Sequence, residues 1–306
     1  MNQKNYKISS QNIQAHSEET SSISVISYEI ENANDNNLNR DAIREQIKDY
    51  KIKGEFPSNL EYVDSYTDPN TGTTSTAFLN QDTGKVTVGM AGTNVHGDQL
   101  KNTLNPFNFI KDKQEAIDAR GSMLDFAADA NIGLRTVTDK DAHFKNTQQF
   151  IKDIKKDYEI DTITGHSLGG RDAIIIGVSN DIDNVVAYNP APLTVKDFRG
   201  IIKGPISSLN DKEKDAYIES FIKSYDGNIL RIVSDKDELN GIIKKTEYVS
   251  AGNEMVIKNG KGHSMLGFLG KREQREIKAE LEKLKGYQDA NNKSFVTAKK
   301  QASNKL

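Results

Sequence analysis

The chain has 306 residues, with 41 lysines and arginines against 44 aspartates and glutamates, for a formal net charge of −3. This near balance argues against a dedicated nucleic-acid binder, which usually carries a strong basic excess. The chain has no cysteine, which excludes disulfides, thiol catalysis and cysteine–metal sites.

We expect neither a Sec signal peptide nor a membrane span in this sequence. Residues 1–22 lack the apolar core of a Sec signal peptide. No stretch approaches the roughly 18 apolar residues that a membrane span needs. We therefore expect either a cytoplasmic protein or one that is exported without a Sec signal.

The N-terminal third of the chain is polar at first and patterned later. Residues 1–35 are rich in Ser, Asn, Gln and Glu, so we expect a flexible, poorly ordered arm with one strand at residues 22–30. Helical spacing of apolar residues predicts a helix over residues 40–52. Two β-type runs around an Asp- and Gly-containing turn predict a hairpin over residues 74–90.

The middle of the chain alternates between strands and helices. After a loop-like stretch at residues 95–112, we expect helices over residues 113–130 and 139–157. The next elements are expected to be a strand at 160–165, a helix at 168–179, a strand at 184–190, a polar helix at 208–224, a strand at 228–234 and a short pair at 247–250 and 254–258. This alternation predicts βαβ units and a mainly parallel sheet.

The last 36 residues form a heavily charged tail. Within residues 271–306, Ile277, Leu281 and Leu284 have the spacing of one helical face. The predicted helix packs on its own domain or begins a region that binds a helical partner protein, and the pattern leaves both interpretations open. We therefore divide the chain into a flexible arm (1–35), an α/β domain (36–270) and a helical tail (271–306).

Residues 165–169, Gly-His-Ser-Leu-Gly, match the pattern G-x-S-x-G between a predicted strand and a predicted apolar helix. This is the context of a nucleophile elbow, in which flanking glycines allow close approach of the backbone around a serine at a sharp turn. Ser167 is therefore a candidate nucleophile. The alternative is a turn serine that caps its helix.

A serine nucleophile needs a base, and the base needs an acid that orients it. In α/β hydrolases these residues follow one another as Ser, Asp or Glu, and His. Of the five histidines, His263 alone follows Ser167, in a glycine-rich loop. Asp237, after the strand at residues 228–234, is the favoured acid and Asp235 the second choice. A solvated loop residue is the alternative for each.

The negative charge of a tetrahedral intermediate needs backbone N–H donors. Leu168, the residue after the candidate nucleophile, is expected to supply one. Thr93 is expected to supply the other, from the Gly92-Thr93 end of the predicted strand over residues 85–94. An ordinary Gly-Thr turn is the alternative for Thr93.

Taken in chain order, these motifs resemble the class 3 lipase family of α/β hydrolases over about residues 85–270. The segments are VGMAGT, DAHFKNTQQFIKDI, ITGHSLGGRDA, VVAYNPAP, RIVSDKDEL and GHS. The resemblance implies an α/β-hydrolase fold, with a central, mostly parallel sheet flanked by helices. It also implies hydrolysis of carboxylic esters in triacylglycerols or glycerophospholipids, without a metal or other cofactor.

Three further features of the sequence bear on the resemblance to class 3 lipases. Ala91 stands where the family usually has an arginine before its Gly-Thr pair. Residues 95–112 include several apolar side chains, and we expect them to form a lid or lipid-facing rim, or else to pack simply. Asp181 and Asp183 suggest calcium, but the remaining ligands are missing, so we expect no metal site.

The layout of a lipase-like domain before a charged helical tail is also similar to the lipase effectors of the Gram-positive type VII secretion system. That resemblance implies export without a Sec signal and a helical partner for the tail. For a protein that acts on a lipid or other ester substrate, we also expect transient contact with a membrane surface. Three other activities would use the same triad: thioester hydrolysis, peptide hydrolysis and acyl transfer. A non-catalytic binding module with this fold is a further alternative.

Overall fold

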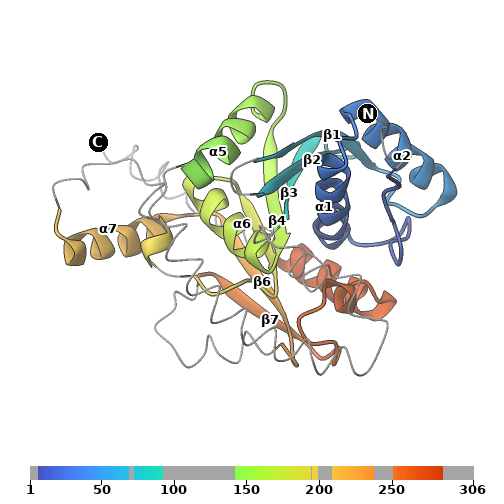
Figure 1. Ribbon diagram of the computed structural model, residues 1–306. Coiled ribbons are helices and arrows are strands. Elements are labelled where there is room, and N and C mark those ends of the chain that lie inside the picture. Colours follow the sequence, from blue (N-terminus) through green and yellow to red (C-terminus); the bar gives the residue numbers. More distant parts are fainter. Residues whose placement is uncertain are drawn as a thin grey trace, which may run out of the picture.

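The computed structural model describes residues 6–68, 72–91, 142–193, 195–198, 209–237 and 251–284. These residues form a seven-stranded sheet with helices on both of its faces (Figure 1). The expected features at Thr93, in the loop 95–112, the helix 113–130, the strand 247–250 and the tail beyond residue 284 lie outside the described residues.

The strands lie in the sheet in the order in which they occur along the chain. β1 to β3 are antiparallel, and β3 to β7 are parallel. The strands are β1 (Leu60–Thr67), β2 (Thr74–Asn80), β3 (Lys85–Ala91), β4 (Ile160–His166), β5 (Asn184–Tyr188), β6 (Asn228–Ser234) and β7 (Asn253–Ile257). Because parallel strands end at one edge of the sheet, the residues that follow β4, β5, β6 and β7 come together there.

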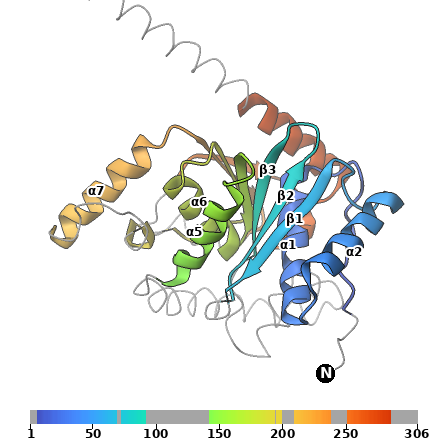
Figure 2. The ribbon, with the colours of Figure 1, turned by 90° about the horizontal axis from the view of Figure 1, so that it is seen from above.

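Figure 2 shows the sheet between two layers of helices. One face is covered by α5 (Ala142–Ile154) and α6 (Leu168–Ser179), and the other by α1 (Glu19–Asp35), α2 (Arg40–Lys53) and a helix over residues 271–284. α7 (Asp211–Ser224) extends away from the sheet (Figure 1). Short 3₁₀ turns lie at Val195–Phe198 and Met265–Phe268.

Helix α1 corrects the expectation for the N-terminal segment. Residues 19–35, expected to belong to a poorly ordered arm with one strand, form a buried helix. Its apolar residues Ile23, Ile26 and Ile30 follow helical spacing and are fully buried. The expectation failed because the buried serines between them were interpreted as a sign of disorder. Hydroxyl groups can be buried where they have hydrogen-bond partners.

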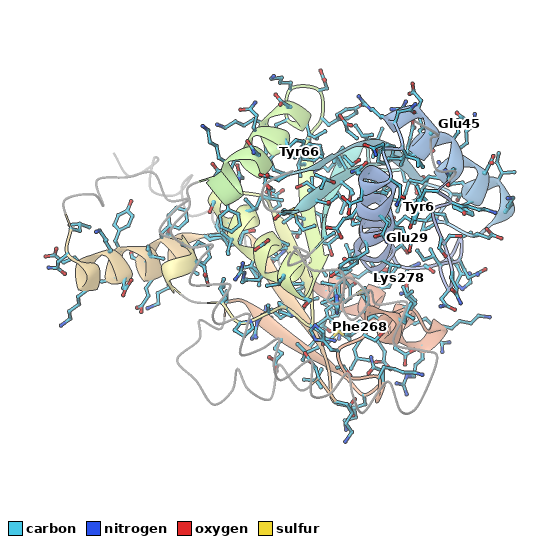
Figure 3. The ribbon with its side chains drawn as sticks, in the orientation of Figure 1. Tyr6, Glu29, Glu45, Tyr66, Phe268 and Lys278 are labelled. Carbon is cyan, nitrogen blue, oxygen red and sulfur yellow. The ribbon has the colours of Figure 1, made fainter. Side chains whose placement is uncertain are left out.

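The residues before α1 also pack on the domain. The Tyr6 hydroxyl donates a hydrogen bond to Glu29 Oε2 at 2.8 Å, and the backbone N–H of Ser9 donates to the same oxygen at 3.0 Å. Figure 3 shows Tyr6 and Glu29 close together beside α1. For the described residues 6–35, the prediction of a flexible arm is therefore wrong.

The described part of the C-terminal tail packs on the same face as α1. Ile277 is fully buried, and Gln274 Nε2 donates to Ser21 Oγ at 2.8 Å. The Glu18 backbone N–H donates to the Gln274 side-chain oxygen. Of the two interpretations of the tail, residues 271–284 follow the first and pack on their own domain. The division into three parts otherwise stays a prediction.

The architecture is that of an α/β hydrolase, as expected: a mostly parallel sheet between helical layers, with a strand–turn–helix at its centre. β3 and β6 both end at the edge at which the parallel strands end. Within the described ranges, no helix is long and apolar enough to cross a bilayer.

Candidate active site

Ser167 is the single residue between β4 and α6, and its backbone is strained. Its φ is 57° and its ψ is −122°, a combination that a non-glycine residue adopts only when surrounding contacts hold it. Two backbone hydrogen bonds do so. The Ser167 N–H donates to the Tyr188 carbonyl at 3.0 Å, and the Ala191 N–H donates to the Ser167 carbonyl at 2.9 Å. The turn is thus tied to the end of β5.

Close contacts surround Gly165 of the motif and Gly170, the residue directly after it. A Cβ on Gly165 would lie 2.4 Å from the Gly169 carbonyl oxygen, and a Cβ on Gly170 would lie 3.2 Å from Pro190 Cα. Residues with side chains do not fit at the first of these positions without displacing the backbone. The pattern G-x-S-x-G therefore allows α6 to begin directly against the end of β4.

Ser167, His263 and Asp237 form one hydrogen-bonded chain. His263 Nε2 lies 2.9 Å from Ser167 Oγ, and His263 Nδ1 lies 3.0 Å from Asp237 Oδ1. Because a carboxylate only accepts, His263 carries its proton on Nδ1 and can accept the serine proton at Nε2. The His263 and Asp237 side chains are 9% and 1% exposed, which limits competition from water.

The alternative role of Ser167 as a helix cap is not observed. Its side chain makes no capping hydrogen bond to α6. The hydroxyl is directed to the imidazole across 96 residues of chain. The structure thus brings together the three side chains that the sequence singled out.

The two candidate acids after β6 have different partners. Asp237 contacts the His263 ring, whereas Asp235 Oδ1 accepts a hydrogen bond from the Gly260 N–H at 3.0 Å. Asp235 therefore holds the loop that carries the histidine. The geometry favours Asp237 as the partner of the imidazole.

Three side chains from three neighbouring strand ends hold that loop by its backbone. Asp235, after β6, binds the Gly260 N–H. Asn189, after β5, donates to the Gly262 carbonyl at 3.2 Å, and His166, the last residue of β4, bonds to the His263 carbonyl at 2.7 Å. Sequence reasoning missed His166, which directly follows a predicted strand, and Asn189, which lies near the end of the next predicted strand.

His166 stays neutral beside the candidate base. Burial first, and the nearby His263 charge second, lower the pKa of His166 to about 3, against the opposing effect of its hydrogen bond to the His263 carbonyl. The two imidazole rings have centroids 4.8 Å apart. A neutral His166 does not oppose a positive charge on His263.

The N-terminus of α6 is the described source of oxyanion donors. Leu168 is the first residue of this helix, and the first N–H groups of an α-helix have no carbonyl partner within it. Positive helix-dipole charge is concentrated at the same place. Thr93, the other expected donor, lies outside the described residues.

Within the described ranges, no group of three or more His, Cys, Asp or Glu side chains is placed to hold a metal ion. The hydrogen-bonded chain described above consists of the Ser167, His263 and Asp237 side chains. The chemistry that these residues can perform without further partners is proton transfer from a hydroxyl, followed by nucleophilic attack.

The sequence matches no protein-family model and no curated protein. Solved structures that resemble the chain include lipase II from Rhizopus niveus, at 14% identity and a TM-score of 0.38 over 79% of this chain and 78% of that one. The Lip2 lipase from Yarrowia lipolytica has 17% identity and a TM-score of 0.31, over 65% of this chain and 66% of that one. Est1E from Butyrivibrio proteoclasticus has 12% identity and a TM-score of 0.33, over 74% of this chain and 99% of that one. Similarity at this level does not extend to activity or substrate.

Proposed function

We propose that the protein is a serine carboxylester hydrolase that acts on lipid esters. The observation that carries the proposal is the hydrogen-bonded chain from Ser167 Oγ through His263 to Asp237, with the serine at a strained turn before α6. A serine is nucleophilic only beside a base, and a base is oriented by its acid. Both conditions are met here.

The first half of the proposed reaction forms an acyl-enzyme. Ser167 Oγ attacks the ester carbonyl while His263 Nε2 takes its proton. Asp237 stabilises the imidazolium that results. As the tetrahedral intermediate collapses, His263 returns the proton to the leaving alkoxide, and an alcohol departs.

The second half regenerates the serine. A water molecule gives a proton to His263 and attacks the acyl carbonyl. The intermediate then expels Ser167 Oγ, which takes the proton back, and a carboxylic acid is released. In both halves of the proposed reaction, the backbone N–H groups of Leu168 and Thr93 donate hydrogen bonds to the oxyanion and stabilise it.

The preference for lipid esters is supported by the resemblance of the sequence motifs to class 3 lipases. Either neutral lipids or phospholipids fit that resemblance. Export by a type VII secretion system, transient membrane contact and a helical partner for the tail stay predictions.

The decisive test is incubation of wild type and Ser167→Ala with mixed lipids, with released fatty acids measured by mass spectrometry. We expect the variant to lose about 10⁴-fold or more of the wild-type rate, because the base then has no hydroxyl to activate. Asp237→Asn should also lose about 10⁴-fold. Asp235→Asn is its matched control, since that side chain binds only the loop backbone among the contacts described, and should lose far less.

Several outcomes would contradict the proposal or narrow it. Full activity in Ser167→Ala would exclude this serine as the nucleophile. Faster turnover of thioesters or amides than of esters, or acyl transfer without hydrolysis, would favour one of the other reactions on the same residues. Lipid binding without turnover by the wild type would favour a non-catalytic module.

A further inference from the structure

Tyr28 connects α1 to the serine turn. Its side chain is half-buried, and its hydroxyl lies 3.2 Å from His166 Nδ1 and 3.0 Å from the His166 carbonyl oxygen. The tyrosine and imidazole rings meet edge to face, with centroids 6.0 Å apart. On its other side the same imidazole bonds to the His263 backbone. Tyr28 is therefore two hydrogen bonds away from the backbone of the candidate base.

The hydrogen-bond partners of His166 determine which of its nitrogens carries the proton. The His263 carbonyl can only accept, so His166 Nε2 must be the donor across the 2.7 Å contact. In a neutral ring, Nδ1 is then an acceptor. The Tyr28 hydroxyl donates to the His166 carbonyl oxygen at 3.0 Å and also faces this nitrogen at 3.2 Å, so its single proton lies between the two acceptors. Tyr28 thus holds both the backbone and the ring of His166, in the tautomer that the His263 carbonyl selects.

The other tautomer would disturb the candidate site. With the proton on His166 Nδ1, the Nε2 lone pair would face the lone pairs of the His263 carbonyl oxygen at 2.7 Å. That contact is repulsive, so the loop would move. His263 Nε2 would then lose its 2.9 Å contact with Ser167 Oγ, and a misplacement of about 1 Å costs on the order of 100-fold in rate.

We propose that Tyr28 is a positioning residue for the reaction, which acts through His166 to hold the backbone of His263 in register with Ser167. The inference rests on the proposed function, because it assigns a role in orienting the base of that mechanism. It gives α1 a part in the reaction besides covering the sheet. Tyr28 itself contacts neither Ser167 Oγ nor the His263 ring in the contacts described.

The test measures activation of the serine separately from substrate binding. A p-nitrophenyl phosphonate ester reacts with the serine and releases nitrophenolate, so the rate of that release reports the reactivity of Ser167. We expect Tyr28→Phe to react about tenfold more slowly. With a short p-nitrophenyl ester, kcat should fall by a similar factor while KM stays within about twofold.

Two further variants separate positioning from folding. Tyr62→Phe is the matched control, because Tyr62 is a buried tyrosine whose hydroxyl lies 2.7 Å from Ser65 Oγ on β1, away from the serine turn; it should keep the wild-type rate. His166→Gln supplies an amide N–H that can reach the His263 carbonyl without a choice of tautomer. In that background the imidazole contact is already absent, so Tyr28→Phe should lose only the contact with the carbonyl of residue 166 and cause a smaller further loss.

The outcomes distinguish this inference from the proposed function. If the wild type does not react with the phosphonate, or if Ser167→Ala reacts equally well, the proposed function is wrong. If the wild type reacts and Tyr28→Phe matches it, only the role of Tyr28 is wrong. A tenfold loss that persists when Tyr28→Phe is added to His166→Gln would mean that Tyr28 acts on stability or packing, which also overturns the inference.

Discussion

The helices on the two faces of the sheet are held by different kinds of contact. The α6 face has a largely aliphatic core, whose buried residues include Ile151, Ile163, Ile174, Ile175, Val178 and Val185. The α1 face also contains buried aliphatic residues, but three pairs of hydroxyl groups cross it. These pairs are Thr20 with Tyr188 at 2.8 Å, Ser24 with Thr164 at 2.9 Å and Ser27 with Thr76 at 2.7 Å.

The two kinds of contact constrain a helix differently. Hydrophobic contact is not directional, so on the α6 face the relative position of helix and sheet is set by close approach at the glycines. Hydrogen bonds require particular distances and angles. Three of them along α1 fix both its rotation and its position along the sheet, and thereby bring Tyr28 to His166. The polar face therefore positions its helix through specific atom pairs.

The largest expected effect is on the free energy of unfolding, when one glycine that contacts each helical layer is replaced by alanine. Gly165→Ala would place a Cβ 2.4 Å from the Gly169 carbonyl oxygen, a backbone atom of the serine turn. Gly89→Ala would place one 2.3 Å from Ser27 Oγ and 2.6 Å from Ile23 Cγ2, which are side-chain atoms of α1. We expect Gly165→Ala to cost more than about 4 kcal/mol, and Gly89→Ala about 1–3 kcal/mol, since α1 can shift slightly.

Urea unfolding measures both costs, and the rate with the phosphonate measures the effect on the site. Equal losses of stability in the two variants would contradict this interpretation, in which rigid backbone atoms limit the space at Gly165 and movable side chains of α1 limit it at Gly89.

A second prediction concerns pH and His166, which lies where the α1 face meets the serine turn. Its pKa is about 3 when folded, against 6.5 for the free side chain. The unfolded chain therefore binds a proton between these values that the folded protein does not. The stability from the neutral ring is fully present above pH 6.5 and is lost as the pH falls toward 3, by about 2 kcal/mol at pH 5.

Chemical denaturation at pH 7 and at about pH 5 tests this prediction. His166→Gln has no group that titrates in this range at that position, so its unfolding free energy should fall by about 2 kcal/mol less than that of the wild type. The same loss in both proteins would mean that another group is responsible.

The smallest expected effect concerns one hydroxyl pair. Ser24→Ala removes the partner of Thr164, but the Thr164 hydroxyl keeps its 2.8 Å hydrogen bond to the Val186 carbonyl. We expect a loss of about 1 kcal/mol in the free energy of unfolding. Ser22→Ala is the matched control, since the Ser22 hydroxyl donates within α1 to the Glu18 carbonyl, and should cost less. A greater cost at Ser22 would show that the pairs across the interface do not stabilise α1.

Much of the fold and the candidate site could be predicted because their determinants are local. The glycines around Ser167 mark a strand-to-helix turn, and strands alternating with helices define a parallel sheet. The order of triad residues along the chain of α/β hydrolases then led from Ser167 to Asp237 and His263. The choice between Asp237 and Asp235 needed coordinates, because both follow β6 and only their distances differ.

The features that were missed depend on contacts between distant residues. Ser21, Ser22, Ser24 and Ser27 give α1 a polar composition, and nothing local indicates that Thr76 and Thr164 lie opposite two of them. The same holds for Tyr28, whose partner is 138 residues away. The first strand, β1, was not predicted either.

The attachment of the His263 loop through main-chain atoms has a practical use. Asp235, Asn189 and His166 all bind backbone groups of the loop, and the residue Lys261 within it is exposed. A cysteine introduced there would be the sole thiol in the chain. A fluorescent dye attached to it would sit two residues from the imidazole and would report the arrival of ligands at the site.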